Sequence, residues 1–194
     1  MIDLEGIAEK LANSLYGDSD MDEIEKAKIE YGFSLTMGLG LTIFLTLVPA
    51  AFLGTFFSTL VLMTAALVTR LFSGGAHCTS YTRCLFLSLL IFIPAGVLAR
   101  YMLAQGSPLF LTLISCTLVL ITLVIHFAKG ARAALPTAII YLVALAAGYI
   151  FQGRFLPQLM LPAGLGVFAQ TVMVTGLGDW IVKRADYLLK RVAK

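Results

Sequence analysis

The reactive side chains of this chain gather in one short segment, residues 70–84, which reads RLFSGGAHCTSYTRC. The segment holds one of the two histidines and two of the three cysteines of the chain. A cysteine and a histidine at one site suggest a nucleophile with its base, and a nearby arginine favours the reactive thiolate. The segment therefore predicts a thiol nucleophile and a histidine base, with Arg70 and Arg83 as candidate electrostatic partners.

The spacing of His77 and Cys84 sets a geometric condition on this chemistry. On one continuous helix the two residues would share a face but lie about 10.5 Å apart, which is too far for proton transfer. The pair therefore requires His77 to lie in a loop at Gly74 and Gly75 and to fold back over the next helix. The same two glycines could bring backbone N–H groups close to a substrate carbonyl. A histidine supplied by a second copy is the alternative, so a homodimer stays open.

A third group that orients the imidazole is hard to find in this sequence, because no carboxylate lies between Glu30 and Asp179. The side chains that could serve are Glu30, Asp179, Gln105 and Gln170. A backbone carbonyl is a further option. We favour a dyad without a third side chain, and Glu30 is the supporting residue that we select.

We expect no cofactor and no metal at this segment. A metal site built from His77, Cys78 and Cys84 would lack a fourth ligand, and the spacing matches no zinc pattern. The net charge of +3 is spread singly between apolar runs, so we also expect no nucleic acid partner.

The composition places this segment in a membrane protein. Hydrophobic residues make up 59% of the chain and charged residues 13%, with a mean hydropathy of +0.93. A soluble domain is about 45–50% apolar and about one quarter charged. Together with the acid-free stretch, these values exclude a soluble enzyme and a disordered chain, and three cysteines without framework spacing exclude a disulfide scaffold. The fold class that remains is an all-α, polytopic membrane helix bundle.

Apolar stretches of about 20 residues predict about six transmembrane helices. They lie near residues 32–49, 52–70, 82–103, 109–127, 134–151 and 162–181. Ile7, Leu11 and Leu15 recur at helical spacing, which predicts an amphipathic helix on the membrane surface before the first span. An ordinary solvated arm and a four-span topology with re-entrant segments are the alternatives.

The lysines and arginines predict the orientation in the membrane. With six spans and a cytoplasmic N-terminus, only Arg100 and Arg154 of the 14 basic residues lie outside. The chain then divides into a cytoplasmic arm (1–30), a transmembrane domain (31–182) with the catalytic segment 70–84 at its cytoplasmic side, and a basic cytoplasmic tail (183–194). We expect membrane lipids to be the surroundings of the domain.

The residues of the reactive segment carry a resemblance to a known family. The string Arg70-Leu-Phe-Ser-Gly-Gly-Ala-His77, followed by Cys84, resembles the signature of the accessory gene regulator B (AgrB) family, and the lead Glu30-Tyr31-Gly32 is similar too. Members of that family are membrane cysteine endopeptidases of Gram-positive quorum sensing. The resemblance implies that His77 and Cys84 are catalytic. Cys78 departs from the small residue expected there and offers an alternative thiol.

The resemblance also implies the substrate, an AgrD-type propeptide with an acidic C-terminal tail, and a place in the cell membrane. Cys84 would attack the bond before the tail, and a cysteine of the peptide would then displace Cys84 and close the thiolactone of an autoinducing peptide. Four basic residues are candidates for binding the acidic tail: Lys183, Arg184, Lys190 and Arg191. The alternative function is a small membrane transporter or channel, although the sequence offers few of the intramembrane charges that transporters use.

Overall fold

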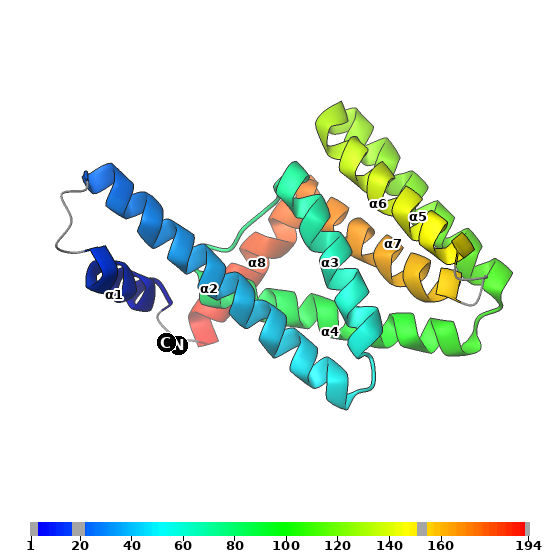
Figure 1. Ribbon diagram of the computed structural model, residues 1–194, viewed down its shortest axis with the longest axis horizontal. Coiled ribbons are helices and arrows are strands. Elements are labelled where there is room, and N and C mark those ends of the chain that lie inside the picture. Colours follow the sequence, from blue (N-terminus) through cyan, green and yellow to red (C-terminus); the bar gives the residue numbers. More distant parts are fainter. Residues whose placement is uncertain (1–3, 17–21, 151–154, 193–194) are drawn as a thin grey trace.

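A computed structural model shows the chain as a set of helices (Figure 1) and describes residues 4–16, 22–150 and 155–192. The helices of this described part are α1 (Leu4–Tyr16), α2 (Glu23–Phe52), α3 (Phe56–Ser73), α4 (Tyr81–Gln105), α5 (Pro108–Lys129), α6 (Ala131–Ile150), α7 (Phe155–Val174) and α8 (Gly176–Val192). No strand occurs within those three ranges. The prediction of an all-α fold is confirmed.

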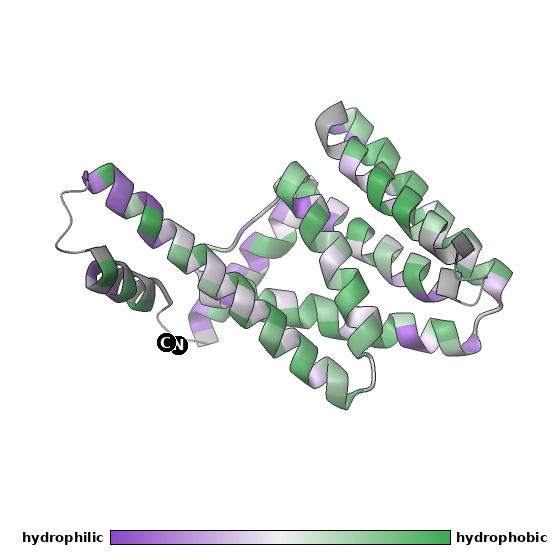
Figure 2. Cartoon of the chain, viewed as in Figure 1, coloured by the Kyte–Doolittle hydropathy of each residue, from purple (hydrophilic) through white to green (hydrophobic). Residues whose placement is uncertain are grey.

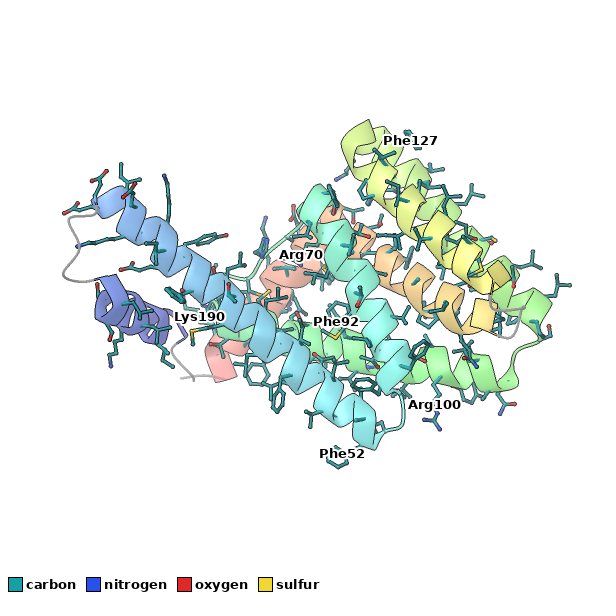
Figure 3. All side chains as sticks on the ribbon, viewed as in Figure 1. Phe52, Arg70, Phe92, Arg100, Phe127 and Lys190 are labelled. Carbon is teal, nitrogen blue, oxygen red and sulfur yellow. The ribbon has the colours of Figure 1, made fainter. Side chains whose placement is uncertain are left out.

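Five helices are long and apolar enough to cross a membrane, so the chain is a multi-pass membrane protein. These spans are α2, α3, α4, α5 and residues Pro157–Val174 of α7. Helix α6 lies where the fifth span was predicted, and the apolar stretch that can be assessed in it is Leu135–Ala144. Phe52 and Phe127 point away from the helices (Figure 3), as expected of side chains that face lipid.

The last predicted span, 162–181, is wrong in its placement. Helix α7 starts before Pro162, which lies inside the helix, and ends at Val174. Thr175 then begins a new helix: its hydroxyl accepts a hydrogen bond from the Gly178 N–H at 3.4 Å, which is an N-cap contact. The polar residues that follow belong to α8, so the predicted span had joined the end of one helix to the start of another.

Helix α3 packs most extensively against α7, which also contacts α5 and α6. Gly166 of α7 lies directly on the Leu62 carbonyl of α3, and Gly96 of α4 lies on the Thr59 side chain of α3. Glycine lets helix backbones approach closely, which is a common packing mode in membranes. These two contacts fix α3 against α4 and α7, whose ends border the reactive segment.

Most polar side chains within the apolar helices have hydrogen-bond partners in the described part of the chain, with the buried Thr122 hydroxyl as an exception. The hydroxyls of Thr42, Thr69 and Thr171 each donate to the carbonyl four residues earlier at 2.7–2.8 Å. The buried imidazole of His126 lies 3.0 Å from the Thr171 hydroxyl and 3.4 Å from that of Thr137. Such pairing is needed because lipid offers no hydrogen-bond partner.

The helices at the two ends of the chain differ from the apolar ones. Figure 2 shows hydrophilic residues at the start of α2 and along α8, whereas α3 to α7 are mostly hydrophobic. Ile7, Leu11 and Leu15 are exposed on α1, and its placement on the membrane surface stays a prediction. Helix α2 is continuous from Glu23 to Phe52. Residues 23–30 of the predicted arm therefore belong to the same helix as the first span.

Basic residues separate toward the two ends of α3. Lys129 donates to the Val174 carbonyl at 2.6 Å, which places the end of α5 beside the end of α7 and near Arg70. Arg100 instead donates to the Gly54 carbonyl, before the start of α3. The 18 residues of α3 span about 27 Å, so the two groups lie at opposite ends of a span. Which end faces the cytoplasm stays a prediction.

The close approach of α3 and α7 predicts a packing effect of Gly166→Ala. A Cβ at this position would meet the Leu62 backbone, which cannot rotate away, so the change should destabilise the protein by about 1–3 kcal/mol. Thermal unfolding in detergent measures the effect. The control is Gly40→Ala in α2, where a Cβ would meet nothing within 4 Å. Equal unfolding temperatures for both variants would contradict the packing argument.

Candidate active site

His77 lies in the connection between α3 and α4, and Cys84 lies in the first turn of α4. The geometric condition set by the spacing is therefore met, because the two residues do not share one straight helix. The connection, residues 74–80, begins with Gly74 at φ +66°, which ends α3. The Gly74 N–H donates to the Arg70 carbonyl at 2.9 Å, so in this conformation it is occupied and does not face a substrate.

Helix α7 holds the start of this connection. Gln170 Nε2 donates to the Gly74 carbonyl at 2.6 Å and lies 3.4 Å from the Ser73 hydroxyl. The Ala76 N–H donates to the Met173 carbonyl at 3.0 Å. Gly75 adopts φ +141°, and a Cβ there would lie 3.0 Å from Gln170 Nε2. Gln170 therefore fixes the backbone of the connection, which is a different task from orienting the imidazole.

Arg70 holds the imidazole of His77. Its Nη2 lies 2.8 Å from Nδ1 and 3.1 Å from Nε2 of the ring, and 3.4 Å from the Ala76 carbonyl oxygen. Arginine carries only donors, so a ring nitrogen of His77 is the acceptor in this contact, and which nitrogen accepts depends on the tautomer. His77 is exposed. An exposed imidazole is accessible to a substrate, and histidine is the most common general base in enzymes.

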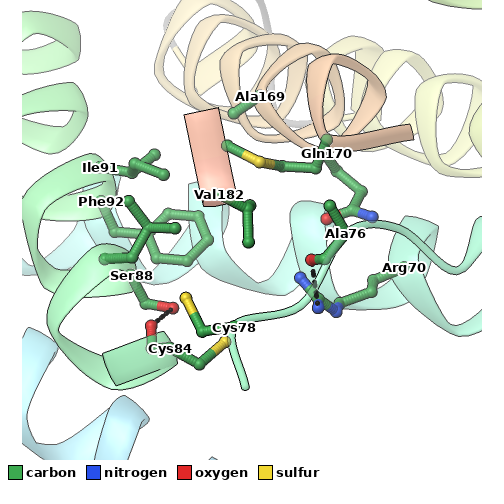
Figure 4. A pocket seen from close by; sticks show the side chains of 12 residues that line it. Arg70, Ala76, Cys78, Cys84, Ser88, Ile91, Phe92, Ala169, Gln170 and Val182 are labelled. Carbon is green, nitrogen blue, oxygen red and sulfur yellow. Dashed lines mark hydrogen bonds between the residues drawn. The ribbon is translucent and has the colours of Figure 1, made fainter. Parts of the chain in front are cut away.

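The thiols of Cys78 and Cys84 are hydrogen-bonded to each other. Figure 4 shows both at one side of a small cavity that Arg70 and Gln170 also line. The hydrogen bond to Cys84, followed by burial, raises the pKa of Cys78 well above its usual range. Cys78 therefore stays protonated, and its S–H group is the hydrogen-bond donor to the sulfur of Cys84. Among the described hydrogen bonds, none joins Cys84 to His77.

A carboxylate that the sequence analysis did not select reaches the segment from α8. Asp186 accepts hydrogen bonds from the Thr79 N–H at 3.2 Å and the Thr79 hydroxyl at 2.9 Å, and it pairs with Arg83 at 2.8 Å. Arg83 is therefore held in this ion pair, and its charge also acts on the neighbouring Cys78 thiol, whose pKa it lowers against the larger effects that raise it. The signal in the sequence was a single acid within the basic tail.

The hydrogen bonds and ion pairs of the described residues join none of the other candidates for a third catalytic group, Glu30, Asp179 and Gln105, to a side chain of the segment. Glu30 belongs to α2, and no hydrogen bond or ion pair joins it to the described part of the cluster. Asp179 is exposed in the first turn of α8, and Gln105 is exposed at the far end of α4. Within the described ranges, no three His, Cys, Asp or Glu side chains are grouped as metal ligands.

The basic residues of the tail lie on α8. Lys183, Arg184, Lys190 and Arg191 are all exposed. The Arg191 guanidinium lies 4.4 Å from the centre of the Tyr187 ring, and Figure 3 labels Lys190 near the end of the helix. The tail is therefore a helix with exposed positive charge.

The contact between the two thiols predicts an order of alkylation. At neutral pH, iodoacetamide should modify Cys84 before Cys78, because only a thiolate reacts and the raised pKa of Cys78 keeps that residue protonated. Peptide mapping by mass spectrometry after brief labelling measures the order. Faster modification of Cys78 would contradict this assignment of donor and acceptor.

The comparison with known proteins identifies the family. The family model described as Accessory gene regulator B matches residues 7–131, which include the whole reactive segment. No curated protein and no solved structure matches the chain. The match covers more than half of the chain, so the protein belongs to the accessory gene regulator B family of the agr quorum-sensing system.

Proposed function

We propose that the protein is a membrane cysteine endopeptidase that removes the C-terminal tail of an AgrD-type propeptide and allows the remaining peptide to close a thiolactone. The observation that carries the proposal is the placement of Cys84 in the first turn of α4, at a cavity that it shares with Arg70, beside the connection that bears His77. Family membership supports the choice of substrate.

Cys84 is the nucleophile of the proposed reaction. The N-terminal end of a helix carries partial positive charge, which stabilises an anionic sulfur there. Arg70 adds a full positive charge at the same cavity. Cys78 contributes a hydrogen-bond donor to the sulfur and is not itself the nucleophile.

The first step breaks the peptide bond before the tail. The Cys84 sulfur attacks the carbonyl carbon, the electron pair moves to the oxygen, and the collapse of this intermediate expels the tail as an amine. The thiol proton passes to His77 and then to the departing nitrogen. The products are an acyl-enzyme thioester and the free tail.

His77 must move from Arg70 toward the reacting atoms in this step. In the proposed step the exposed ring leaves Arg70 by a change of its side-chain angles, while the connection stays anchored at Ala76 and Thr79. Catalytic contacts are often long without substrate and tighten when the substrate binds. His77 and Cys84 belong to the same chain, so the proposal requires no second copy.

The second step exchanges one thioester for another. A cysteine thiol of the peptide attacks the acyl carbon, and Cys84 leaves as thiolate while the ring closes. Because thioesters stand on both sides, this exchange is nearly balanced in free energy, whereas the first step is uphill. Departure of the tail or the ring pulls the reaction forward, and a site at a membrane limits hydrolysis of the intermediate.

The orientation follows from the same proposal. The ends of α3, α5 and α7 carry Arg70, Lys129 and the start of the basic helix α8. The positive-inside rule assigns this end of the spans to the cytoplasm. With α6 as a sixth crossing in addition to the five long apolar spans, the proposed active site and both termini then lie on the cytoplasmic side, where the propeptide is made.

The proposal predicts the behaviour of three cysteine variants. Cys84→Ala should abolish cleavage of a co-expressed AgrD-type propeptide while the protein still inserts into the membrane, because the nucleophile is gone. Cys78→Ala should still cleave, since Cys84 remains. The matched control is Cys116→Ala in α5, whose sulfur lies 2.8 Å from the Tyr141 hydroxyl and far along the chain from the site. Cleavage by Cys84→Ala, measured as tail release by mass spectrometry, would reject the mechanism.

The exposed face of α8 is the proposed binding surface for the acidic tail of the substrate. Its four exposed cations complement acidic side chains, and α8 begins where α7 meets the reactive connection. Opposite charges across a surface guide association and depend on ionic strength.

Charge reversal of this surface tests the role. The variant carries Lys183→Glu, Arg184→Glu, Lys190→Glu and Arg191→Glu. KM should rise by about fivefold or more, since exposed ion pairs contribute about 0.2–1 kcal/mol each, while kcat changes little. Lys10→Glu with Lys28→Glu, on α1 and α2, is the control for net charge, and it is compared with the double variant Lys190→Glu with Arg191→Glu, which changes the net charge by the same amount. An unchanged KM would remove α8 from substrate binding.

A further inference from the structure

We infer that Asp186 of α8 is a positioning residue for the proposed active site, acting through Thr79 and Arg83 on the spacing between His77 and Cys84. The catalytic meaning of this inference rests on the proposed function. The residue lies beyond the range matched by the family, 7–131, so nothing in that match assigns it a role.

The carboxylate of Asp186 binds two residues, Thr79 and Arg83, which are the chain neighbours of the two cysteines. Its Oδ1 accepts from the Thr79 N–H at 3.2 Å and from Arg83 Nη1 at 2.8 Å, while its Oδ2 accepts from the Thr79 hydroxyl at 2.9 Å. Thr79 follows Cys78 in the chain, and Arg83 precedes Cys84. One side chain therefore ties the end of the connection to the first turn of α4.

The environment makes these contacts strong. The side chains of Arg83 and Asp186 are only 14% and 15% exposed. Hydrogen bonds between ionised groups are stronger than neutral ones, and they gain further strength where water is largely excluded. Loss of the carboxylate would leave the Arg83 guanidinium shielded from water without this partner, which would force it to move.

Helix α8 is itself seated against the site. Val182 is buried and lines the cavity that Cys84 also lines (Figure 4). Asp186 follows Val182 by four residues, one turn later on the same face of the helix. The inner face of α8 is thus directed at the active site, while its cations stay on exposed positions.

The connection is held at its two ends by different helices. Gln170 and Met173 of α7 hold residues 74 and 76, and Asp186 of α8 holds residue 79. His77 and Cys78 lie between these anchors. Release of the second anchor lets the connection shift relative to α4, and a shift of about 1 Å at a reacting group costs about 10²-fold in rate.

The test compares Asp186→Asn with Asp179→Asn, which removes the same charge from an exposed position in the same helix. For Asp186→Asn, kcat for an AgrD-type propeptide in proteoliposomes should fall by roughly tenfold to a hundredfold with little change in KM. Hydrogen–deuterium exchange of residues 74–80 should become faster, and the rate of Cys84 alkylation by iodoacetamide should change. Asp179→Asn should match the parent protein in all three measurements.

A milder variant guards against misfolding. Thr79→Val removes the hydroxyl contact to Oδ2 and keeps the ion pair, so its kcat should lie between those of the parent and of Asp186→Asn. Each kcat is divided by the amount of folded protein, which is measured as the final extent of Cys84 labelling by iodoacetamide. A lower kcat then reports a misplaced active site and not a smaller amount of folded protein. If Asp186→Asn fails to accumulate in membranes, Thr79→Val decides the question.

The outcomes separate the two proposals. If the parent protein does not cleave the propeptide, the proposed function fails, and the exchange and alkylation rates still judge the positioning role without any peptide. Parent-like kcat, exchange and alkylation in Asp186→Asn would overturn the inference. An equal fall in kcat for Asp179→Asn would also overturn the inference, because the change in net charge alone would then explain the lower rate.

Discussion

The scarcity of negative charge is the constraint on which the rest of the site depends. No carboxylate lies between Glu30 and Asp179, yet Arg70 and Arg83 flank the reactive segment. An ionised side chain at the edge of a membrane needs a partner, because its desolvation is costly. Arg70 obtains one from the His77 ring and a backbone carbonyl, and Arg83 obtains one from Asp186. The site is therefore complete only when the last helix folds back onto it.

The packing of apolar helices determines where those partners lie. Gly166 brings α7 onto the backbone of α3, and Gln170 and Met173 follow it by about one and two turns of the same helix. Their polar atoms then reach the connection after α3. Thr175 ends α7 and starts α8, which turns Asp186 toward Thr79. A close contact between Gly166 of α7 and the backbone of α3 thus positions side chains at the end of these helices.

Composition and local spacing were sufficient to predict the membrane fold, the reactive segment and the need for His77 to lie off the helix of Cys84. They could not predict Asp186, because its partners are more than 100 residues away and no local pattern links them. The break at Thr175 was missed for a related reason. A single threonine that caps a helix is a weak sequence signal for a helix start when it follows a long apolar run. The hydropathy pattern therefore predicts a span that continues to residue 181. The contact between Cys78 and Cys84 depends on the path of a glycine-containing connection, which spacing does not fix.

The neighbouring thiols raise a question of selectivity in the proposed mechanism. Once Cys84 carries the acyl group, the sulfur of Cys78 is the nearest competing acceptor. The acyl group removes the Cys84 anion, so burial and the Asp186 carboxylate are what still raise the pKa of Cys78; they favour its thiol form, which is a poor nucleophile compared with a thiolate. The acyl group therefore stays on Cys84 until a thiolate of the peptide arrives. A second cysteine beside the nucleophile is compatible with cyclisation because its environment holds the proton on its sulfur.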